Sequence, residues 1–218
     1  DTIQNIHVMK MDCVVMRHPV PGSCLQLTNY VDVPIVNAGD GTHEHPTQAL
    51  LDMMSIKERF GKIEGLNIGI IGDILHSRVA LSNIYGLTKM GANVKVCAPP
   101  HLLQRGIEKL GVSVCYDVDD LIDWADAINV LRIQKERMGI GLIPSTREYR
   151  AFFGITNERL SRHKKELVIM HPGPINRGVE IDSEVADSDQ AIILDQVLNG
   201  VAVRMSVLYL LLGSKDFE

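Results

Sequence analysis

Long apolar runs are missing from this sequence, and so is an excess of basic residues. The longest apolar runs, such as residues 207–212, are far shorter than the roughly 20 residues that cross a bilayer, so we expect no transmembrane helix. The 22 Lys and Arg residues are outnumbered by 27 Asp and Glu residues, which gives a net charge of -5. This balance argues against a broad surface for nucleic acid or anionic membranes, but it allows a small cationic pocket.

Paired cysteine motifs are missing as well. The four cysteines, Cys13, Cys24, Cys97 and Cys115, contain no C-x-x-C pair, and three of them lie in or beside apolar runs. We therefore expect reduced core residues of a cytosolic protein rather than a disulfide framework or a zinc site. The sequence also lacks an initiator methionine and a signal peptide, so we expect it to be part of a longer polypeptide.

Short apolar runs rich in β-branched residues alternate with segments of helical spacing along the 218 residues. The hydrophobicity of these runs is nearly continuous, which indicates strands buried on both faces. The sequence therefore predicts an α/β fold: doubly wound parallel sheets covered by helices, with the site in the crevice between two domains. The expected strands are residues 13–16, 33–36, 66–71, 93–98, 127–131 and 167–170.

A helix is expected over residues 47–60, because its apolar residues have helical spacing and Gly61 is a suitable C-terminal cap. We place a domain boundary near residues 60–65. The chain then divides into a first unit at 1–60 that ends in this bridging helix, a second unit at 61–188, and a C-terminal helix within 189–218 that packs back on the first unit. Residues 134–148 combine glycine, proline and charged residues and are expected to form a long flexible loop.

Polar clusters follow five of the expected strands. The carboxyl ends of parallel strands meet at one edge of a sheet, which is where ligands bind in open α/β folds. Arg17, Arg78 and Arg132 lie in these clusters, and guanidinium groups match the geometry of carboxylates and phosphates. Any one of them could be an ordinary surface residue. Together they favour a pocket for a substrate that carries several negative charges.

The stretch NAGDGTHEHPTQ, residues 37–48, leaves alternatives open. Asp40, His43 and His45 could coordinate a metal, but the H-x-H spacing is not that of a helical zinc pair. His45, followed closely by Gln48 at a helix start, suits a neutral hydrogen-bonding group aimed at an oxygen that gains negative charge. A histidine that merely caps or packs the helix is an equal alternative.

A dinucleotide cofactor is not expected. Ile71-Gly72-Asp73 follows a strand as in a Rossmann start, but Gly69 and Gly72 lack the G-x-G-x-x-G spacing.

Five segments carry a family resemblance: Arg17-His18-Pro19, NAGDGTHEHPTQALLD at 37–52, GDILHSRVA at 72–80, LRIQKER at 131–137 and HPGPINRGVEI at 171–181. In order and spacing they resemble the aspartate/ornithine carbamoyltransferase family, and within it the catalytic chains that use aspartate. The resemblance covers essentially the whole chain. Ornithine-using relatives carry His-Cys-Leu-Pro where this chain has His171-Pro172-Gly173-Pro174, which disfavours ornithine as the acceptor.

The resemblance implies transfer of the carbamoyl group of carbamoyl phosphate to the amine of L-aspartate, an early step of pyrimidine synthesis, without a metal or an organic cofactor. By the same resemblance, Arg17 and His45 would polarise the carbamoyl carbonyl and stabilise the oxyanion, and Gln48 would hold the carbamoyl amide. The implied substrate-binding residues also include Arg78, Arg132 and Gln134, which would grip the two carboxylates of aspartate, and the backbone of Pro172 and Gly173 near the carbamoyl nitrogen.

The resemblance also implies identities for the units and for the assembly. Residues 1–60 would be the C-terminal part of a carbamoyl-phosphate-binding domain, and residues 61–188 the aspartate-binding domain. A cytoplasmic homotrimer with active sites shared between subunits is expected, with a regulatory chain or another pathway enzyme as a further partner. Neither a nucleic acid nor a membrane is expected as a partner.

Two features depart from the family pattern. The Ser-Thr-Arg-Thr-Arg phosphate-binding motif and the Ser/Lys loop that a neighbouring subunit contributes do not occur, so we expect them upstream of Asp1 and expect little or no turnover from this segment alone. Gly173 stands where relatives often carry a bulkier residue. The alternatives are a non-catalytic remnant or assembly subunit of the same fold, and carbamoyl transfer to another amino acid such as ornithine.

Overall fold

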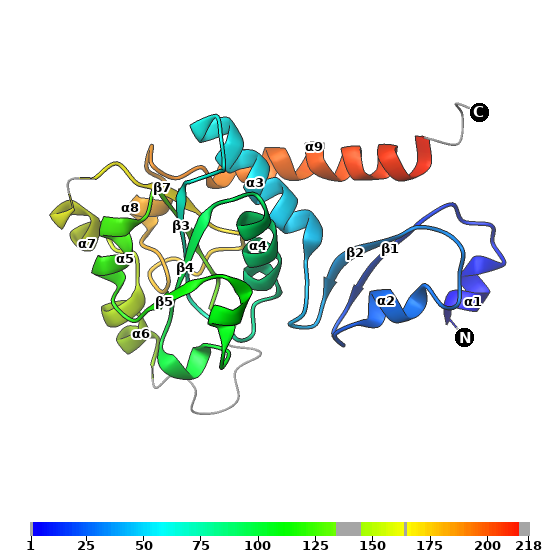
Figure 1. Ribbon diagram of the computed structural model, residues 1–218, viewed down its shortest axis with the longest axis horizontal. Coiled ribbons are helices and arrows are strands. Elements are labelled where there is room, and N and C mark those ends of the chain that lie inside the picture. Colours follow the sequence, from blue (N-terminus) through cyan, green and yellow to red (C-terminus); the bar gives the residue numbers. More distant parts are fainter. Residues whose placement is uncertain (1, 134–144, 164, 214–218) are drawn as a thin grey trace.

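The computed structural model describes residues 2–133, 145–163 and 165–213, which form two lobes built on separate parallel sheets (Figure 1). The smaller lobe has a sheet of two parallel strands with a short helix against it. Its elements are α1 (Thr2–His7), β1 (Val14–His18), α2 (Ser23–Leu27) and β2 (Ile35–Asp40). The pairing of β1 with β2 places the ends of both strands, at His18 and Asp40, on the side that faces the larger lobe.

The larger lobe contains a five-stranded parallel sheet in the order β5-β4-β3-β6-β7. The chain moves outward from β3 to β5 and then returns to the other side of β3 with β6 and β7. The topological switch point, where ligands bind in open α/β sheets, therefore lies between β3 and β6. The elements are β3 (Asn67–Ile71), α4 (Arg78–Lys89), β4 (Asn93–Cys97), η1 (Pro100–Leu102), η2 (Ile107–Leu110), β5 (Ser113–Cys115), α5 (Val118–Trp124), β6 (Ala127–Val130), α6 (Thr146–Phe153), α7 (Asn157–Arg162), β7 (Val168–Met170) and α8 (Ser183–Ala186).

The predicted α/β class is confirmed, and the strands owe their burial to the sequence feature that predicted them. β-branched residues fill β3 and β6, and helices cover both faces of the sheet, so that one apolar cluster forms around Ile70 and another around Ile128. All six expected strands are present. β5 is the strand that the sequence did not predict, because its three residues lie at the sheet edge and are only partly buried.

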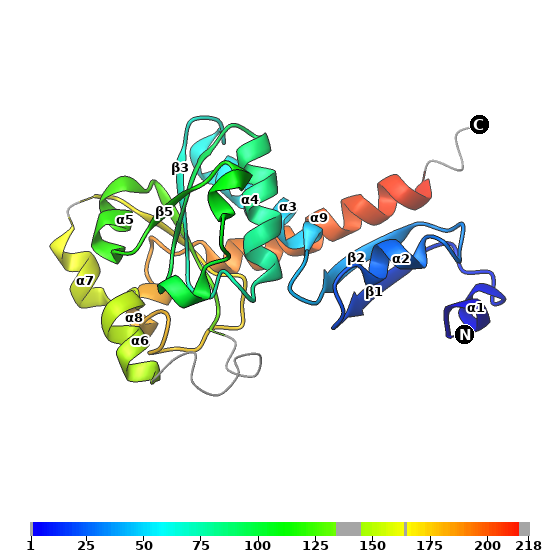
Figure 2. The same cartoon turned by 60° about the horizontal axis from the view of Figure 1, so that its bottom comes forward.

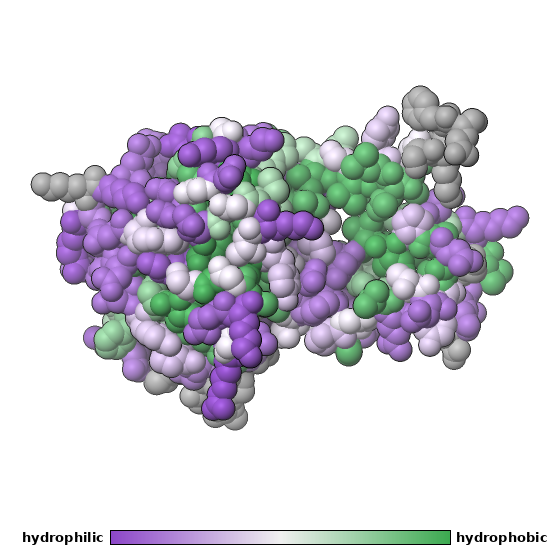
Figure 3. All heavy atoms as spheres, viewed as in Figure 1, coloured by the Kyte–Doolittle hydropathy of each residue, from purple (hydrophilic) through white to green (hydrophobic). Residues whose placement is uncertain are grey.

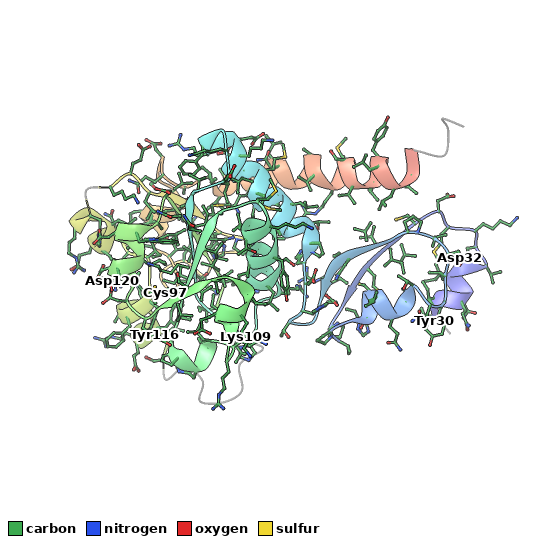
Figure 4. All side chains as sticks on the ribbon, viewed as in Figure 1. Tyr30, Asp32, Cys97, Lys109, Tyr116 and Asp120 are labelled. Carbon is green, nitrogen blue, oxygen red and sulfur yellow. The ribbon has the colours of Figure 1, made fainter. Side chains whose placement is uncertain are left out.

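All four cysteines are free thiols. Cys24 and Cys97 are buried, whereas Cys13 and Cys115 are only partly buried, so two of the four lie outside the core in which they were expected. Figure 4 shows Cys97 inside the larger lobe, on the strand β4 that pairs with β5.

The helix α3 (Pro46–Phe60) joins the two lobes along the chain, and the long helix α9 (Ile193–Leu212) extends from the larger lobe alongside the smaller one (Figure 2). α3 matches the expected helix, and Gly61 caps it in the left-handed conformation. The first half of α9 packs on α3, where Gln196 and Asn199 donate hydrogen bonds to Asp52 and Ser55. The chain therefore returns from the larger lobe along the helix that joins the two lobes.

α9 differs from the sequence expectation in one respect. By length and composition alone it is apolar enough to cross a membrane, although no uninterrupted apolar run is that long. The two results differ because the mean hydropathy of the helix stays high even where isolated polar residues, such as Asn199 and Arg204, interrupt the apolar runs. Its outer half is largely exposed, and Figure 3 shows hydrophobic atoms gathered there and on the adjacent surface of the smaller lobe.

Gly72 follows β3, and replacing it tests how closely the chain approaches Leu131 beyond the end of β6. Its φ is +130°, and a Cβ at this position would lie 3.0 Å from the carbonyl oxygen of Leu131, which follows β6. Gly72→Ala should therefore lower the free energy of unfolding by about 2–3 kcal/mol, through backbone strain and this contact. The measurement is denaturant unfolding of the purified variants.

The matched control is Gly65→Ala. Gly65 also has a positive φ, of +74°, but its added Cβ would meet nothing within 4 Å. Backbone strain alone should then cost about 1 kcal/mol. Equal losses in the two variants would show that the approach of the strand ends does not constrain Gly72.

Candidate active site

A pocket of about 300 Å³ lies between the lobes, at the carboxyl ends of strands from both sheets. It is lined by Arg17, His45, Gln48, Ser77, Arg78, Val79, Arg132, Pro172, Gly173, Pro174 and Arg204. The structure thus brings together seven of the eight predicted site residues. The eighth, Gln134, lies outside the described residues, as does most of the loop expected at 134–148.

The strand order explains why residues far apart in the sequence meet here. Arg78 begins α4 directly after β3, and Arg132 follows β6, so these arginines flank the switch point of the larger sheet. Pro172 follows the neighbouring strand β7. Arg17 lies in β1, and His45 follows β2, so the smaller lobe supplies the opposite wall.

The pocket is also lined by four residues that were not predicted as site residues: Ser77, Val79, Pro174 and Arg204. Ser77 is the N-cap of α4, where its side chain accepts a hydrogen bond from the backbone N–H of Ala80. Arg204 is the only basic residue of the otherwise apolar helix α9. Arg204 is exposed, and one basic residue on a helix is ordinary at a protein surface, so the sequence pattern gave no indication of its place in the pocket.

Arg78 is almost fully buried and extends from the larger lobe to the smaller one. Its guanidinium donates to the carbonyl oxygen of Gly41 at 3.5 Å and lies against Gly39, where a Cβ would be 2.6 Å from Nε. A side chain at Gly39 would displace the guanidinium, so the glycines of the 37–42 segment allow this arginine to cross between the lobes.

His45 is the N-cap residue of α3, but its ring makes no capping bond to the helix. Its backbone N–H donates to Ser82 Oγ at 2.9 Å, which fixes the chain on α4. Burial, together with the positive charges of Arg78, Arg204 and Arg17, lowers the pKa of His45 to about 4. The imidazole is therefore neutral at physiological pH and can donate a hydrogen bond without carrying a charge.

Asp40 organises the loop between β2 and α3. Its carboxylate accepts hydrogen bonds from the backbone N–H groups of Gly22 (2.7 Å) and Glu44 (3.0 Å) and contacts Asn37 Nδ2 and His43 Nδ1. Burial alone would raise the pKa of Asp40, but these hydrogen bonds outweigh it and lower the pKa to about 2. The carboxylate therefore stays ionised and holds the loop that presents His45.

A metal site formed by Asp40, His43 and His45 was the other interpretation of this loop. Within the described part of the chain, no group of three or more His, Cys, Asp and Glu residues is placed to hold a metal ion. Asp40 and His43 bond to each other, whereas His45 lines the arginine pocket.

A second cavity, of about 500 Å³, lies in the smaller lobe beside α1 and α2. Among the described residues that line it are His18, Ser23 and Tyr30, but no Lys or Arg. The described lining of this cavity thus lacks the cations that a polyanion needs, whereas the interlobe pocket has four arginines and is our candidate site.

Comparisons with known families account for nearly the whole chain. Residues 1–58 match the carbamoyl-P binding domain, and residues 64–211 the Asp/Orn binding domain, of aspartate/ornithine carbamoyltransferases. The chain belongs to this family.

The most similar carbamoyltransferases include bacterial aspartate carbamoyltransferase catalytic subunits. The subunit from Christiangramia forsetii is 61% identical over 211 residues, a match that covers 97% of this chain and 68% of the relative. The subunit from Gemmatimonas aurantiaca is 56% identical over 215 residues, which covers 99% of this chain and 67% of the relative.

Solved structures of the family share the fold. The catalytic subunit of M. jannaschii aspartate transcarbamoylase is 36% identical, with a TM-score of 0.82 over 100% of this chain and 72% of that chain. The Trypanosoma cruzi aspartate transcarbamoylase in complex with carbamoyl phosphate and aspartate is 28% identical, with a TM-score of 0.77 over 95% of this chain and 69% of that chain. The ornithine carbamoyltransferase from Pyrococcus furiosus is 26% identical, with a TM-score of 0.80 over 97% and 70% of the two chains.

In this carbamoyltransferase the segment His171-Pro172-Gly173-Pro174 is fixed by hydrogen bonds of His171. His171 is fully buried; its Nδ1 accepts from the backbone N–H of Gly173 at 2.9 Å, and its Nε2 lies 3.2 Å from Glu180 Oε1. Gly173 has a φ of +63°, and a Cβ there would meet nothing within 4 Å. A bulkier residue would find space at this position, so glycine is favoured here by backbone conformation and not by crowding.

The charge of the pocket should be measurable on His45. In the protein its imidazole should titrate near pH 4 and remain neutral from pH 5 to 8, because the positive state is buried among arginines. Arg204→Met removes one of these charges and should raise the pKa of His45. The measurement is an NMR titration of the histidine ring protons, with the His45 signal assigned by its loss in His45→Gln.

Arg59→Met is the control for a change of net charge. Arg59 is exposed and pairs with Glu166 at 3.0 Å, away from the pocket, so its removal should leave the His45 titration unchanged. A His45 signal that titrates above pH 6 in the unmodified protein would contradict this electrostatic description.

Proposed function

We propose that this protein transfers the carbamoyl group of carbamoyl phosphate to the amine of L-aspartate, which gives N-carbamoyl-L-aspartate and phosphate. The observation that carries the proposal is the convergence of Arg17, Arg78, Arg132 and Arg204 around His45 and Gln48 in one interlobe pocket. Carbamoyl phosphate and aspartate together bring a phosphate and two carboxylates, and guanidinium groups bind both kinds of anion. The relatives named above support the same assignment.

The reaction forms a C–N bond and breaks a C–O bond. The amine of aspartate attacks the carbamoyl carbon, the amine loses a proton, and phosphate leaves as the tetrahedral intermediate collapses. The carbonyl oxygen gains negative charge on the way, and we assign its stabilisation to Arg17 and His45. Because the pKa of His45 is about 4, the imidazole is a poor general base at neutral pH and acts as a hydrogen-bond donor to this oxygen.

The remaining roles follow the position of each residue in the pocket. Arg78 and Arg132 lie on either side of the switch point in the larger lobe, and we assign them to the two carboxylates of aspartate. Gln134 remains a predicted partner of the same carboxylates. Gln48 and the backbone of Pro172 and Gly173 face the carbamoyl amide in this assignment. Two substrates held in contact in this way react with a much smaller entropic cost than in free solution.

The same proposal extends to the parts of the chain and to its assembly. Residues 1–60 form part of the carbamoyl-phosphate side and include the bridging helix, residues 61–188 form the aspartate side, and residues 189–218 carry the C-terminal helix that packs back on the first unit. We also propose a cytoplasmic homotrimer with shared active sites. The family resemblance supports the trimer, and the free thiols agree with a reducing compartment.

An acceptor assay tests the proposal directly, on the full-length protein that includes the upstream phosphate-binding motif expected from the resemblance. The protein is incubated with carbamoyl phosphate and with either L-aspartate or L-ornithine, and the carbamoylated products are measured by mass spectrometry. Product from aspartate, at a much higher kcat/KM than from ornithine, is expected. A preference for ornithine would overturn the choice of acceptor, and the absence of both products with intact, folded protein would favour a non-catalytic member of the family.

The assigned roles predict different kinetic effects for two arginines. Arg132→Ala should raise the KM for aspartate more than tenfold with a smaller change in kcat, because it removes a carboxylate contact made in both ground and transition states. Arg17→Ala should mainly lower kcat, by about 10²–10³, because it removes an interaction that strengthens as the oxyanion forms. Steady-state kinetics with each substrate varied in turn measures both parameters. Similar changes of KM and kcat in the two variants would contradict this division.

A further inference from the structure

A buried carboxylate outside the pocket receives four hydrogen bonds from side-chain amides. Asp52 lies one turn after Gln48 in α3 and is fully buried. Its Oδ1 accepts from Gln48 Nε2 (3.1 Å) and Gln196 Nε2 (2.7 Å). Its Oδ2 accepts from Asn83 Nδ2 (2.7 Å) and Asn129 Nδ2 (3.2 Å). The donors come from α3, α9, α4 and β6, so Asp52 lies where the two lobes are joined.

In the part of the chain that the structure describes, no cation is bonded to this carboxylate, and its partners are side-chain amides. Burial raises the pKa of Asp52 to about 6 against the opposing effect of the four amides, so the group is still ionised at neutral pH. An uncompensated buried carboxylate is an expensive way to join helices, because apolar side chains can do the same. Its properties as a hydrogen-bond acceptor point to another role.

The carboxylate determines which way the Gln48 amide faces. An ionised carboxylate only accepts hydrogen bonds, so the NH2 group of Gln48 must point to Asp52. The carbonyl oxygen Oε1 is then the end of the amide left for the pocket that Gln48 lines. The carbamoyl NH2 group of the proposed substrate is a donor and needs an acceptor. The reversed amide would present a second NH2 group to it and leave the donors unpaired.

The second wall of the pocket is connected to the same carboxylate. Gln196 donates to Asp52 through Nε2, and its Oε1 accepts from the backbone N–H of His171 at 2.9 Å. His171 in turn accepts from the backbone N–H of Gly173 at 2.9 Å. This hydrogen-bond chain runs from Asp52 to the backbone that lines the pocket opposite Gln48.

We propose that Asp52 is a positioning residue for carbamoyl recognition: it orients the Gln48 amide so that Oε1 accepts a hydrogen bond from the carbamoyl NH2, and it anchors the Pro172-Gly173 backbone through Gln196 and His171. Asp52 does not itself line the pocket. The inference rests on the proposed function, because it names the group that Gln48 meets.

A double-mutant cycle tests whether Asp52 acts through Gln48. Asp52→Ala and Gln48→Ala are each expected to lower kcat/KM for carbamoyl phosphate by about tenfold or more, chiefly through KM. The double variant should be little worse than the poorer single variant, because without the Gln48 amide there is less for Asp52 to orient. A merely structural Asp52 would give effects that multiply, and that result would overturn the proposal.

Asp52→Asn gives a second test that does not depend on the stability of the alanine variant. The Asn carbonyl oxygen can still face Gln48 and Gln196. Its NH2 group meets Asn83 and Asn129, whose amides must turn over so that their Oδ1 atoms, which are buried without a hydrogen-bond partner in the described structure, accept in place of the present Nδ2 donors. This variant should recover kcat/KM to within about threefold of the unmodified protein, since the acceptor toward Gln48 is kept. A folded Asp52→Asn with a loss as large as that of Gln48→Ala would overturn the proposal.

Asn83→Ala is the matched control for disturbing the cluster. It removes a bond to Oδ2 and leaves both bonds to Oδ1, so it should lower Tm while KM for carbamoyl phosphate stays within about threefold. A KM increase equal to that of Asp52→Ala would overturn the proposal.

The unmodified protein is assayed first for turnover and, by calorimetry, for carbamoyl phosphate binding. If the unmodified protein turns over but the effects of Asp52→Ala and Gln48→Ala on kcat/KM multiply in the double variant, only this inference is overturned. If the unmodified protein shows neither turnover nor carbamoyl phosphate binding, the proposed function is overturned.

Discussion

The contact between α3 and α9 is the constraint on which the pocket depends, because it brings Arg204 of α9 to the pocket that His45 and Gln48 line at the start of α3. The contact is polar where it is most buried: Asn199 donates to Ser55 Oγ at 3.0 Å and to Glu58 Oε2 at 2.6 Å, and Gln196 donates to Asp52. Hydrogen bonds have directional requirements that apolar packing lacks, so they specify one arrangement of the helices. A small rotation of α9 would break several of them together.

That arrangement concentrates positive charge in an otherwise acidic protein. The net charge is -5, yet Arg17, Arg78, Arg132 and Arg204 share one pocket with a neutral histidine. Like charges brought this close disfavour the empty pocket, and a ligand with several negative charges relieves the repulsion. Burial of His45 and, after it, the charges of these arginines lower its pKa, because a further positive charge in this place is unfavourable. The pocket thus favours an anionic ligand and keeps its imidazole as an uncharged donor.

The sequence allowed the fold class and most of the pocket to be predicted, because both depend on local patterns. Arg78 begins the helix that follows β3, Arg132 lies two residues after β6, and the carboxyl ends of parallel strands necessarily meet at one edge. Arg204 was missed because it lies in the middle of a helix, and only the packing of α9 on α3 brings it to the strand ends. Asp52 was missed for a similar reason: in the sequence it is one polar residue of an amphipathic helix. Its partners Asn83, Asn129 and Gln196 lie 31, 77 and 144 residues away.

His43 and His45 are the same type of residue, but their different environments give them different roles. Both belong to the same loop and are separated by one residue, yet His43 is half-exposed and bonds to Asp40, while His45 is turned into the pocket among the arginines. The difference arises from the loop that Asp40 holds and from Ser82, which fixes the backbone of His45. A pair of histidines at this spacing could have served a metal. Here the backbone separates them, so that one stabilises the loop and the other is free to meet a substrate oxygen.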